Sequence, residues 1–262
     1  MGTRISWDAL RAIYRRLAIE ALDREIGRDK RHYACNAAFA LQRLEEGIEL
    51  AAHFPSKYGE RALSILDLGA GNGGVSVALA NESRNRVVAA DIVVNATATA
   101  LRRETGIPFA QVVASADRLP FGDASFDVVL CLETLEHLPA FRAAAREMMR
   151  VLRPGGQVMI TTPARARFLL KPDPHFAVRG LMLLPDALQR RVVVDRLRLT
   201  RDYDVAHIFW SAGSIIRAFP GRGRTETLVA IPWPGRPRNL REVLWKIFRR
   251  YLWDRIVIYR RG

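Results

Sequence analysis

Four glycines interrupt the chain directly after a short apolar run, in the stretch Ser64-Ile-Leu-Asp-Leu-Gly-Ala-Gly-Asn-Gly-Gly74. The apolar run is typical of a buried strand, and the amphipathic stretch that follows is typical of a helix. Glycine suits a backbone that turns sharply and lets a ligand approach where a Cβ would obstruct it. The amide groups at the start of the helix then face an electronegative part of that ligand. The stretch therefore predicts a strand, a tight turn and a helix around a bound ligand.

Two carboxylates make this prediction more specific. Gly69, Gly71 and Gly74 satisfy the pattern G-x-G-x-x-G, which by itself is a weak signal for a dinucleotide site. Asp67 lies two residues before the first of these glycines, and Asp91 ends the next apolar run. A carboxylate at the tip of the second strand can accept hydrogen bonds from both hydroxyls of a ribose. We therefore interpret the region as a site for a nucleoside-containing cofactor.

Apolar runs alternate with helical segments over much of the chain. The alternation predicts right-handed crossovers and a mostly parallel sheet with helices on both faces, which is an α/β doubly wound fold. Two helices, at 6–26 and 29–53, are expected before it. The predicted strands are 64–68, 86–91, 110–114, 126–132, 157–162, 227–231 and 255–259, and the predicted helices among them are 73–82, 94–105, 139–152, 185–194, 214–219 and 239–253.

Five motifs resemble, in order and spacing, the class I S-adenosylmethionine-dependent methyltransferases, and most closely the subgroup that acts on small molecules, quinones and lipids. The motifs are Asp67-Leu-Gly-Ala-Gly-Asn-Gly73, Asp91, Ala116-Asp117, the segment from Phe126 to His137 and the segment from Leu152 to Pro163. The resemblance implies a Rossmann-like, seven-stranded sheet with an antiparallel last strand. It divides the chain into an N-terminal helical cap (1–60) and a methyltransferase domain (61–262), with a substrate-lid insertion after strand 5 at about 164–206.

The resemblance also implies which residues bind S-adenosyl-L-methionine. The glycine loop would surround the methionine end of the cofactor, and Asp67 would support this loop through hydrogen bonds. Asp91 would hold the ribose hydroxyls, and Asp117 would accept a hydrogen bond from the adenine amino group. The full set is Asp67, Gly69, Ala70, Gly71, Gly73, Asp91, Ile92, Ala116, Asp117 and Leu132.

Methyl transfer from a sulfonium is an in-line displacement, so the enzyme chiefly binds the donor, orients the nucleophile and excludes water. Neither a metal ion nor a covalent nucleophile is required. The fourth strand ends at Cys131-Leu-Glu133, and it lacks the Asn/Asp-Pro-Pro-aromatic motif of many amino-group methyltransferases. This absence favours O- or C-methylation over N-methylation.

A hydroxyl acceptor benefits from a general base, and histidine is the usual one near neutral pH. His175 in the insertion and His137 after the fourth strand are the candidates. Each also has a purely structural interpretation, as a packed or capping side chain. For a third histidine, His207, packing or capping is the preferred interpretation.

The formal net charge of +14 is distributed unevenly. Residues 1–139 contain 16 Lys and Arg against 18 Asp and Glu, whereas residues 140–262 contain 25 against 9. A basic half indicates an anionic partner, such as a nucleic acid, an acidic membrane surface or a phosphorylated substrate. The predicted helix at 239–253 has an apolar stripe beside arginines and tryptophans, which fits either packing on the sheet or binding to an acidic membrane surface.

Cys35 and Cys131 lie far apart, and no Cys-x-x-Cys or Cys/His cluster indicates a disulfide framework or a zinc site. No signal peptide and no apolar run of membrane-spanning length is evident. We therefore expect a cytoplasmic protein, with peripheral association at the inner face of the membrane as a further expectation.

The predicted function is S-adenosylmethionine-dependent methyl transfer to a small-molecule, lipid-linked or glycan acceptor. Three alternatives remain open on the sequence. They are an RNA methyltransferase, a non-catalytic cofactor-binding module that regulates a partner enzyme, and an NAD-dependent dehydrogenase.

Overall fold

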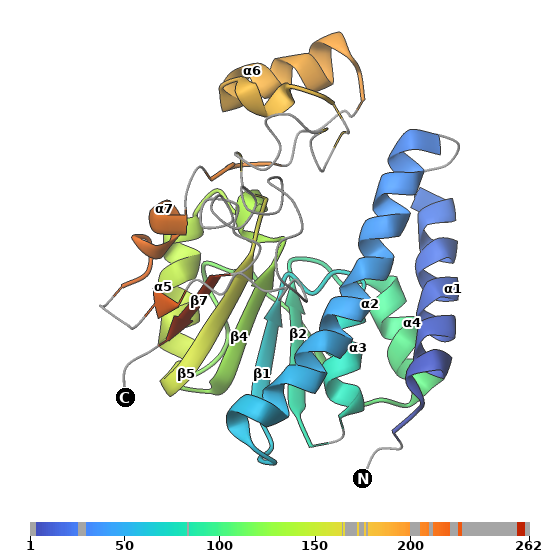
Figure 1. The fold of residues 1–262 in the computed structure, drawn as a ribbon, viewed down its shortest axis with the longest axis vertical. Helices are drawn as coiled ribbons and strands as arrows, with labels where there is room; N and C mark the ends of the chain where they lie inside the picture. Colours follow the sequence, from blue (N-terminus) through green and yellow to red (C-terminus); the bar gives the residue numbers. More distant parts are fainter. Residues whose placement is uncertain are drawn as a thin grey trace, which may run out of the picture.

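The computed structural model describes residues 4–25, 30–82, 84–163, 165, 172, 176, 178–199, 205–209, 212–220, 225–226 and 256–259. Its α-helices are α1 (Trp7–Glu25), α2 (Lys30–Tyr58), α3 (Gly74–Asn81), α4 (Ala96–Thr105), α5 (Phe141–Val151), α6 (Asp186–Arg190) and α7 (Ala212–Ile216). The strands are β1 (Ser64–Leu68), β2 (Arg86–Asp91), β3 (Ala110–Val113), β4 (Phe126–Leu132), β5 (Leu152–Thr161), β6 (Thr225–Glu226) and β7 (Ile256–Tyr259). Figure 1 shows their arrangement.

The strands form one sheet in the order β3-β2-β1-β4-β5-β7-β6. β1 pairs in parallel with β2 and with β4, while β3 and β5 pair in parallel on the outer sides of these two. β7 runs antiparallel to β5, and β6 runs antiparallel to β7. The carboxyl ends of β1 and β4 therefore lie side by side at the point where the strand order reverses. Ligands of open α/β sheets bind at this point, and the predicted doubly wound α/β fold is confirmed.

Helices cover both faces of the sheet (Figure 1), and apolar side chains pack between the helices and the sheet. On one face, helices α1 to α4 bury a cluster that includes Leu10, Leu44 and Leu79. On the other face, α5 and α7 bury a second cluster that includes Met148 and Ile215. Every residue of β4 is buried as a result, as expected for a central parallel strand. In the described part of the chain, no helix has both the length and the apolar character needed to cross a membrane.

Strand β5 begins earlier than the sequence predicts. Leu152 already pairs with Phe126, and an irregularity separates this pair from the pairing of Gln157 with Val128. The Pro-Gly-Gly segment predicted to end the preceding helix therefore lies within β5, as a bulge. The segments predicted as a strand at 227–231 and as a helix at 239–253 lie outside the described residues.

The two ends of the insertion lie next to each other on the domain. The N–H of Arg165 donates a hydrogen bond of 3.1 Å to the carbonyl of Phe209, which joins the two ends. The amides of Ala206 and His207 donate bonds of 2.8 and 2.9 Å to the carbonyl of Glu136, in the short 3₁₀ helix η1 (Leu135–His137) after β4. The insertion is thus anchored at the carboxyl end of β4.

Between these ends, residues 178–199 form the 3₁₀ turn η3 (Leu181–Leu183), then α6, and then the π-helical segment η4 (Arg191–Arg196). Figure 1 shows α6 at the top of the molecule, above the sheet. The single helix predicted from 185 to about 194 is therefore a short α-helix that continues as a π-helix.

Candidate active site

The glycine loop of residues 69–74 joins β1 to α3. Gly69 has φ of 75° and Gly71 has φ of 48°, in the region that disfavours residues with a Cβ. A Cβ on Gly69 would overlap the side chain of Thr134, which follows β4, whereas a Cβ on Gly71 would meet no atom within 4 Å. Gly69 therefore lets the loops after β1 and β4 touch. Gly71 leaves open space in which a bound group can lie against the backbone.

Asp91, at the tip of β2, connects this loop to the next one. Its Oδ2 accepts a hydrogen bond of 2.9 Å from the N–H of Gly71, and its Oδ1 accepts one of 2.7 Å from the N–H of Ile92. A second connection runs from the Asn95 side-chain amide to Asn72 Oδ1 at 2.9 Å. Asp91 is only partly buried, so its remaining lone pairs can accept hydrogen bonds from a ligand.

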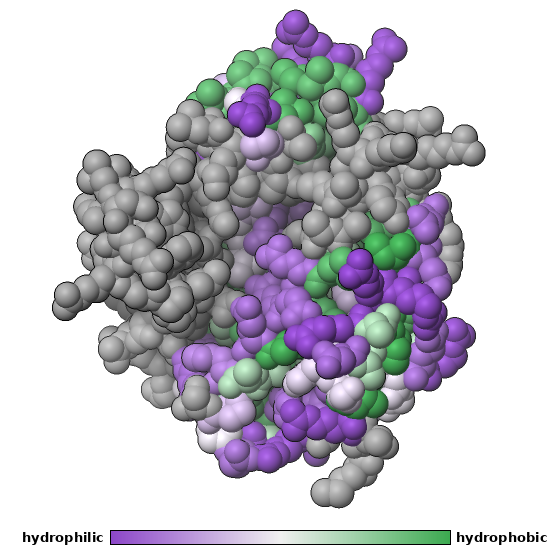
Figure 2. All heavy atoms as spheres, turned by 45° about the vertical axis from the view of Figure 1, so that its right-hand side comes forward, coloured by the Kyte–Doolittle hydropathy of each residue, from purple (hydrophilic) through white to green (hydrophobic). Residues whose placement is uncertain are grey.

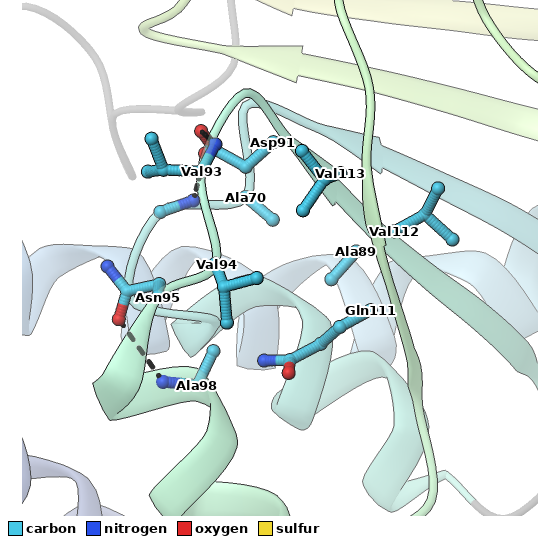
Figure 3. A pocket seen from close by; sticks show the side chains of 11 residues that line it. Ala70, Ala89, Asp91, Val93, Val94, Asn95, Ala98, Gln111, Val112 and Val113 are labelled. Atoms are coloured by element: carbon cyan, nitrogen blue, oxygen red, sulfur yellow. Dashed lines mark hydrogen bonds between the residues drawn. The ribbon is translucent and has the colours of Figure 1, made fainter.

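An open pocket lies between the glycine loop, the β2–α4 loop and β3 (Figure 3). Of the predicted cofactor residues, Ala70, Gly71 and Asp91 line it. Its walls are largely apolar and include Val94 and Val112. Ile92 follows Asp91 in the β2–α4 loop and is 71% exposed at the surface. The pocket thus offers a carboxylate beside apolar walls, which suits a sugar attached to an aromatic base.

The other two predicted carboxylates have protein partners. Asp67 is buried and accepts a 2.5 Å hydrogen bond from the Ser76 hydroxyl of α3, and burial raises the pKa of its carboxyl group to about 6. Asp117 is exposed and accepts a 2.6 Å hydrogen bond from Ser115 in the turn after β3. Asp67 therefore holds α3 to the end of β1, and Asp117 stabilises a turn. Their contacts with a cofactor stay predictions.

Glu133 brings a further carboxyl group to the site, directly after β4. Its φ of 50° is unfavourable for a residue other than glycine. Its N–H donates a bond of 2.8 Å to the Thr161 carbonyl and one of 3.1 Å to the Thr161 hydroxyl oxygen. Burial and the negative charge of Glu136 raise the pKa of Glu133 to about 7. A carboxyl group that titrates near neutral pH is therefore held at the carboxyl end of β4.

The sequence prediction placed Glu133 at the end of the fourth strand but did not include it among the site residues. The available signal was a charged residue that directly follows the apolar run Val128-Val-Leu-Cys-Leu132. Two other residues of the predicted cofactor site, Leu132 and Ala116, are both buried. Gly73 lies at the start of α3, where a Cβ would approach Ala98 to 2.8 Å.

The histidines differ in their surroundings. His137 ends η1, and its Nε2 lies 3.9 Å from the Glu136 carboxylate. The His207 ring packs edge-on against Phe141 with a centroid separation of 4.9 Å, and its Nε2 lies 3.2 Å from the Pro139 carbonyl. The packing role predicted for His207 is therefore confirmed. His175 lies outside the described residues, so its role as a base stays a prediction.

Cysteine and metal chemistry find little support in the described part of the chain. Burial raises the pKa of the Cys131 thiol well above its usual range, which keeps the thiol protonated. Within the same residues, no group of three or more His, Cys, Asp or Glu side chains is placed to hold a metal ion.

The sheet order, the glycine loop after β1 and the carboxylate at the tip of β2 define a nucleoside-binding α/β domain. Residues 66–160 match the protein family described as "Methyltransferase domain". The chain therefore contains a class I S-adenosylmethionine-dependent methyltransferase domain. For this domain, the predicted family, enzyme class and cofactor, S-adenosyl-L-methionine, are confirmed.

Curated relatives resemble part of the chain. The 27-O-demethylrifamycin SV methyltransferase of Amycolatopsis mediterranei is 36% identical over 129 residues, which are 48% of this chain and 44% of the relative. The demethylmenaquinone methyltransferase of Beutenbergia cavernae is 39% identical over 113 residues, which are 42% of this chain and 45% of the relative. The chain thus spans about half the length of the curated relatives it matches.

One solved structure is similar over nearly the whole chain. It is a chain in the complex between the Haloferax volcanii Trm112 methyltransferase activator and a methyltransferase, with a TM-score of 0.52 and 16% identity. The similarity covers 99% of this chain and 100% of that chain. At this level of identity, it supports the fold alone.

Proposed function

We propose that the protein transfers a methyl group from S-adenosylmethionine to a small-molecule, lipid-linked or glycan acceptor, with O- or C-methylation favoured. The observation that carries the proposal is the open space over Gly71 beside the Asp91 carboxylate, at the sheet edge where β1 and β4 end. Two relatives support the acceptor class, because their names refer to a rifamycin and to a menaquinone precursor.

The residues present fit the cofactor. The Asp91 carboxylate, which accepts the Gly71 N–H, would also accept hydrogen bonds from the ribose hydroxyls, and the open space over Gly71 would accommodate the chain that leaves the ribose. Ile92, Ala116 and Asp117 would contact the adenine. When bound, the cofactor supplies an electrophilic methyl group on a positively charged sulfur.

The end of β4 suits this positive charge. Besides burial, the negative charge of Glu136 raises the pKa of Glu133, the charges of Glu46 and Asp91 raise the pKa of Asp67, and Arg43 of α2 lowers both pKa values in part. A cation bound beside these groups favours their ionised forms. The site therefore becomes more negative when a cationic ligand binds.

Glu133 is the proton acceptor that we propose for a hydroxyl or carbon-acid acceptor. A base works best when its pKa lies near the operating pH, and the pKa of Glu133 is about 7. Its strained backbone, fixed by the bond to Thr161, holds the carboxyl group at the end of β4. His137 and His175 stay as the bases predicted from the sequence.

The function is tested by incubating the purified protein with isotopically labelled S-adenosylmethionine. The acceptors are 27-O-demethylrifamycin SV, demethylmenaquinone and fractions of a cell extract. Label in a small molecule or in the organic phase, absent with Asp91→Ala and retained with Asp123→Ala, is the expected result. Asp123 is a matched control, because its carboxylate is 77% exposed and pairs with Arg150.

Other outcomes would redirect the assignment. Nuclease-sensitive label would identify an RNA methyltransferase. Binding of S-adenosylhomocysteine without label in any fraction would identify a non-catalytic module. Tight binding of NAD alone would contradict the cofactor assignment.

A further inference from the structure

The insertion exposes large apolar side chains that its own packing does not use. Leu183, Leu188 and Leu197 are 63%, 42% and 45% exposed. They belong to η3, α6 and the end of η4, within the 22 residues 178–199. Figure 2 shows hydrophobic side chains gathered over the segment at the top of the molecule, with hydrophilic ones at their edge. Single exposed leucines are ordinary, but three in one short projecting segment form a surface.

The inward side of the same segment is already packed. Leu181, Met182 and Val193 are almost fully buried. The Arg165 guanidinium donates a hydrogen bond of 2.9 Å to the Leu184 carbonyl and pairs with Asp186. These contacts fix the position of α6, so the three exposed leucines are not needed to hold the insertion in place.

Positive charge accompanies these leucines. Residues 178–199 contain two aspartates, one of which pairs with Arg165, and five arginines. The arginines are Arg179, Arg190, Arg191, Arg196 and Arg198, and all five are exposed. We call the three leucines and the last four of these arginines the insertion surface. Apolar side chains among arginines match the interface of a bilayer with anionic headgroups.

The same features argue against a nucleic acid as the partner. Proteins that bind single strands stack the bases on aromatic side chains. Residues 178–199 contain no aromatic residue. Binding to RNA would also give the exposed leucines no role.

The insertion surface lies at the acceptor end of the domain. The returning chain is hydrogen-bonded to the carbonyl of Glu136, three residues after Glu133. A bilayer in contact with the insertion would therefore be on the side where the strands end. From there, a lipid-linked acceptor can reach the site without crossing water.

We propose that the insertion surface binds an anionic lipid bilayer, with its leucines in the interfacial layer and its arginines against the headgroup phosphates. The proposal concerns the location at which the protein works, and it does not depend on the acceptor or on catalysis.

The test is flotation of the full-length protein with two kinds of vesicle. One is phosphatidylcholine alone, and the other is phosphatidylcholine with about a quarter phosphatidylglycerol. We expect binding to the anionic vesicles that falls at high salt, because surface electrostatics are screened. The triple variant Leu183→Ser, Leu188→Ser, Leu197→Ser should lower the vesicle partition coefficient about tenfold or more.

Charge variants distinguish this surface from a general charge effect. Arg196→Glu with Arg198→Glu should abolish the preference for anionic vesicles. The matched control is Arg103→Glu with Arg146→Glu, which changes the net charge equally at exposed positions of α4 and α5. The control should keep most of the binding. Unchanged binding of S-adenosylhomocysteine, measured by calorimetry, verifies that each variant is folded, and Leu183→Ser alone replaces the triple variant if that one is not.

Three results would overturn the proposal. The first is no flotation of the wild-type protein with anionic vesicles at low salt. The second is an equal loss in the two charge variants, and the third is full binding by the leucine variant. A gel shift with a single-stranded RNA oligonucleotide that depends on the arginines but not on the leucines would instead identify a nucleic-acid surface.

Discussion

Asp91 is the residue whose replacement tests the cofactor site most directly. Its carboxylate already orders two loops through bonds of 2.9 Å to Gly71 and 2.7 Å to Ile92. In Asp91→Ala both bonds are lost, together with the acceptors that we propose for the ribose hydroxyls. The two amides lie at the surface and can bond to water instead, so the folded domain should lose little stability.

The effect on affinity follows from the hydrogen bonds to the ligand. A bond to a charged group contributes about 1.5–3 kcal/mol, and the partial exposure of Asp91 favours the lower end. Loss of one or two bonds therefore weakens binding by about 1–3 kcal/mol, which raises the dissociation constant about 5- to 150-fold. Asp91→Asn keeps one acceptor oxygen and the side-chain volume, so its loss should be smaller.

Calorimetric titration with S-adenosylhomocysteine measures this effect. Asp123→Ala, at an exposed carboxylate of the same type, should bind like the wild-type protein. Unchanged affinity in Asp91→Ala would show that the carboxylate of β2 does not hold the ribose. A large fall in thermal stability with normal affinity for S-adenosylhomocysteine would show that Asp91 only stabilises the two loops.

Three further predictions concern other parts of the structure. Glu133→Gln should lower kcat about 10²- to 10⁴-fold and remove the rise in rate that accompanies ionisation of the Glu133 carboxyl group, at or below about pH 7 because the bound cofactor favours the ionised form; an unaltered pH profile would exclude it as the base. Asp127 accepts hydrogen bonds from Ser64 and two arginines, which keep its pKa below the usual range, so Asp127→Asn should cost about 2 kcal/mol in urea unfolding at pH 7. The difference should shrink as pH falls below about 4, since the wild-type carboxylate then becomes protonated, and a constant difference would contradict this. Gly69→Ala should destabilise the protein by about 1–3 kcal/mol through its positive φ and its overlap with Thr134, and Thr134→Ala in the same chain should restore part of the loss in a double-mutant cycle.

The sequence predicts the first five strands well because each is a short apolar run closed by turn residues. β1, β2 and β4 have the predicted bounds, since burial in the sheet makes most of each strand apolar. β5 begins earlier because its bulge places one proline and two glycines, which normally end elements, inside a paired strand. Local sequence does not encode the partner strand that makes this pairing favourable.

The site is predictable where a motif determines the backbone and less so where distant segments meet. Gly71 and Asp91 follow from the loop and from the strand end, and the structure places them in contact. The role of Glu133 depends on Thr161 and Glu136, and its raised pKa depends on burial that no local pattern reports. The periodicity of its residues likewise does not indicate that η4 is a π-helix.

The hydrogen bond between Arg165 and Phe209 joins the two ends of the insertion, so the insertion is a loop whose ends are held together by the domain. The conformational entropy of closing such a loop depends weakly on length, with about 0.6 kcal/mol for each doubling. The segment between these residues can therefore be lengthened, shortened or grafted from another protein while the strands beneath it keep their register. Acceptor specificity and cofactor binding can then be changed separately. A chimaera that exchanges only this loop should take the acceptor specificity of the donor protein and keep its own cofactor binding.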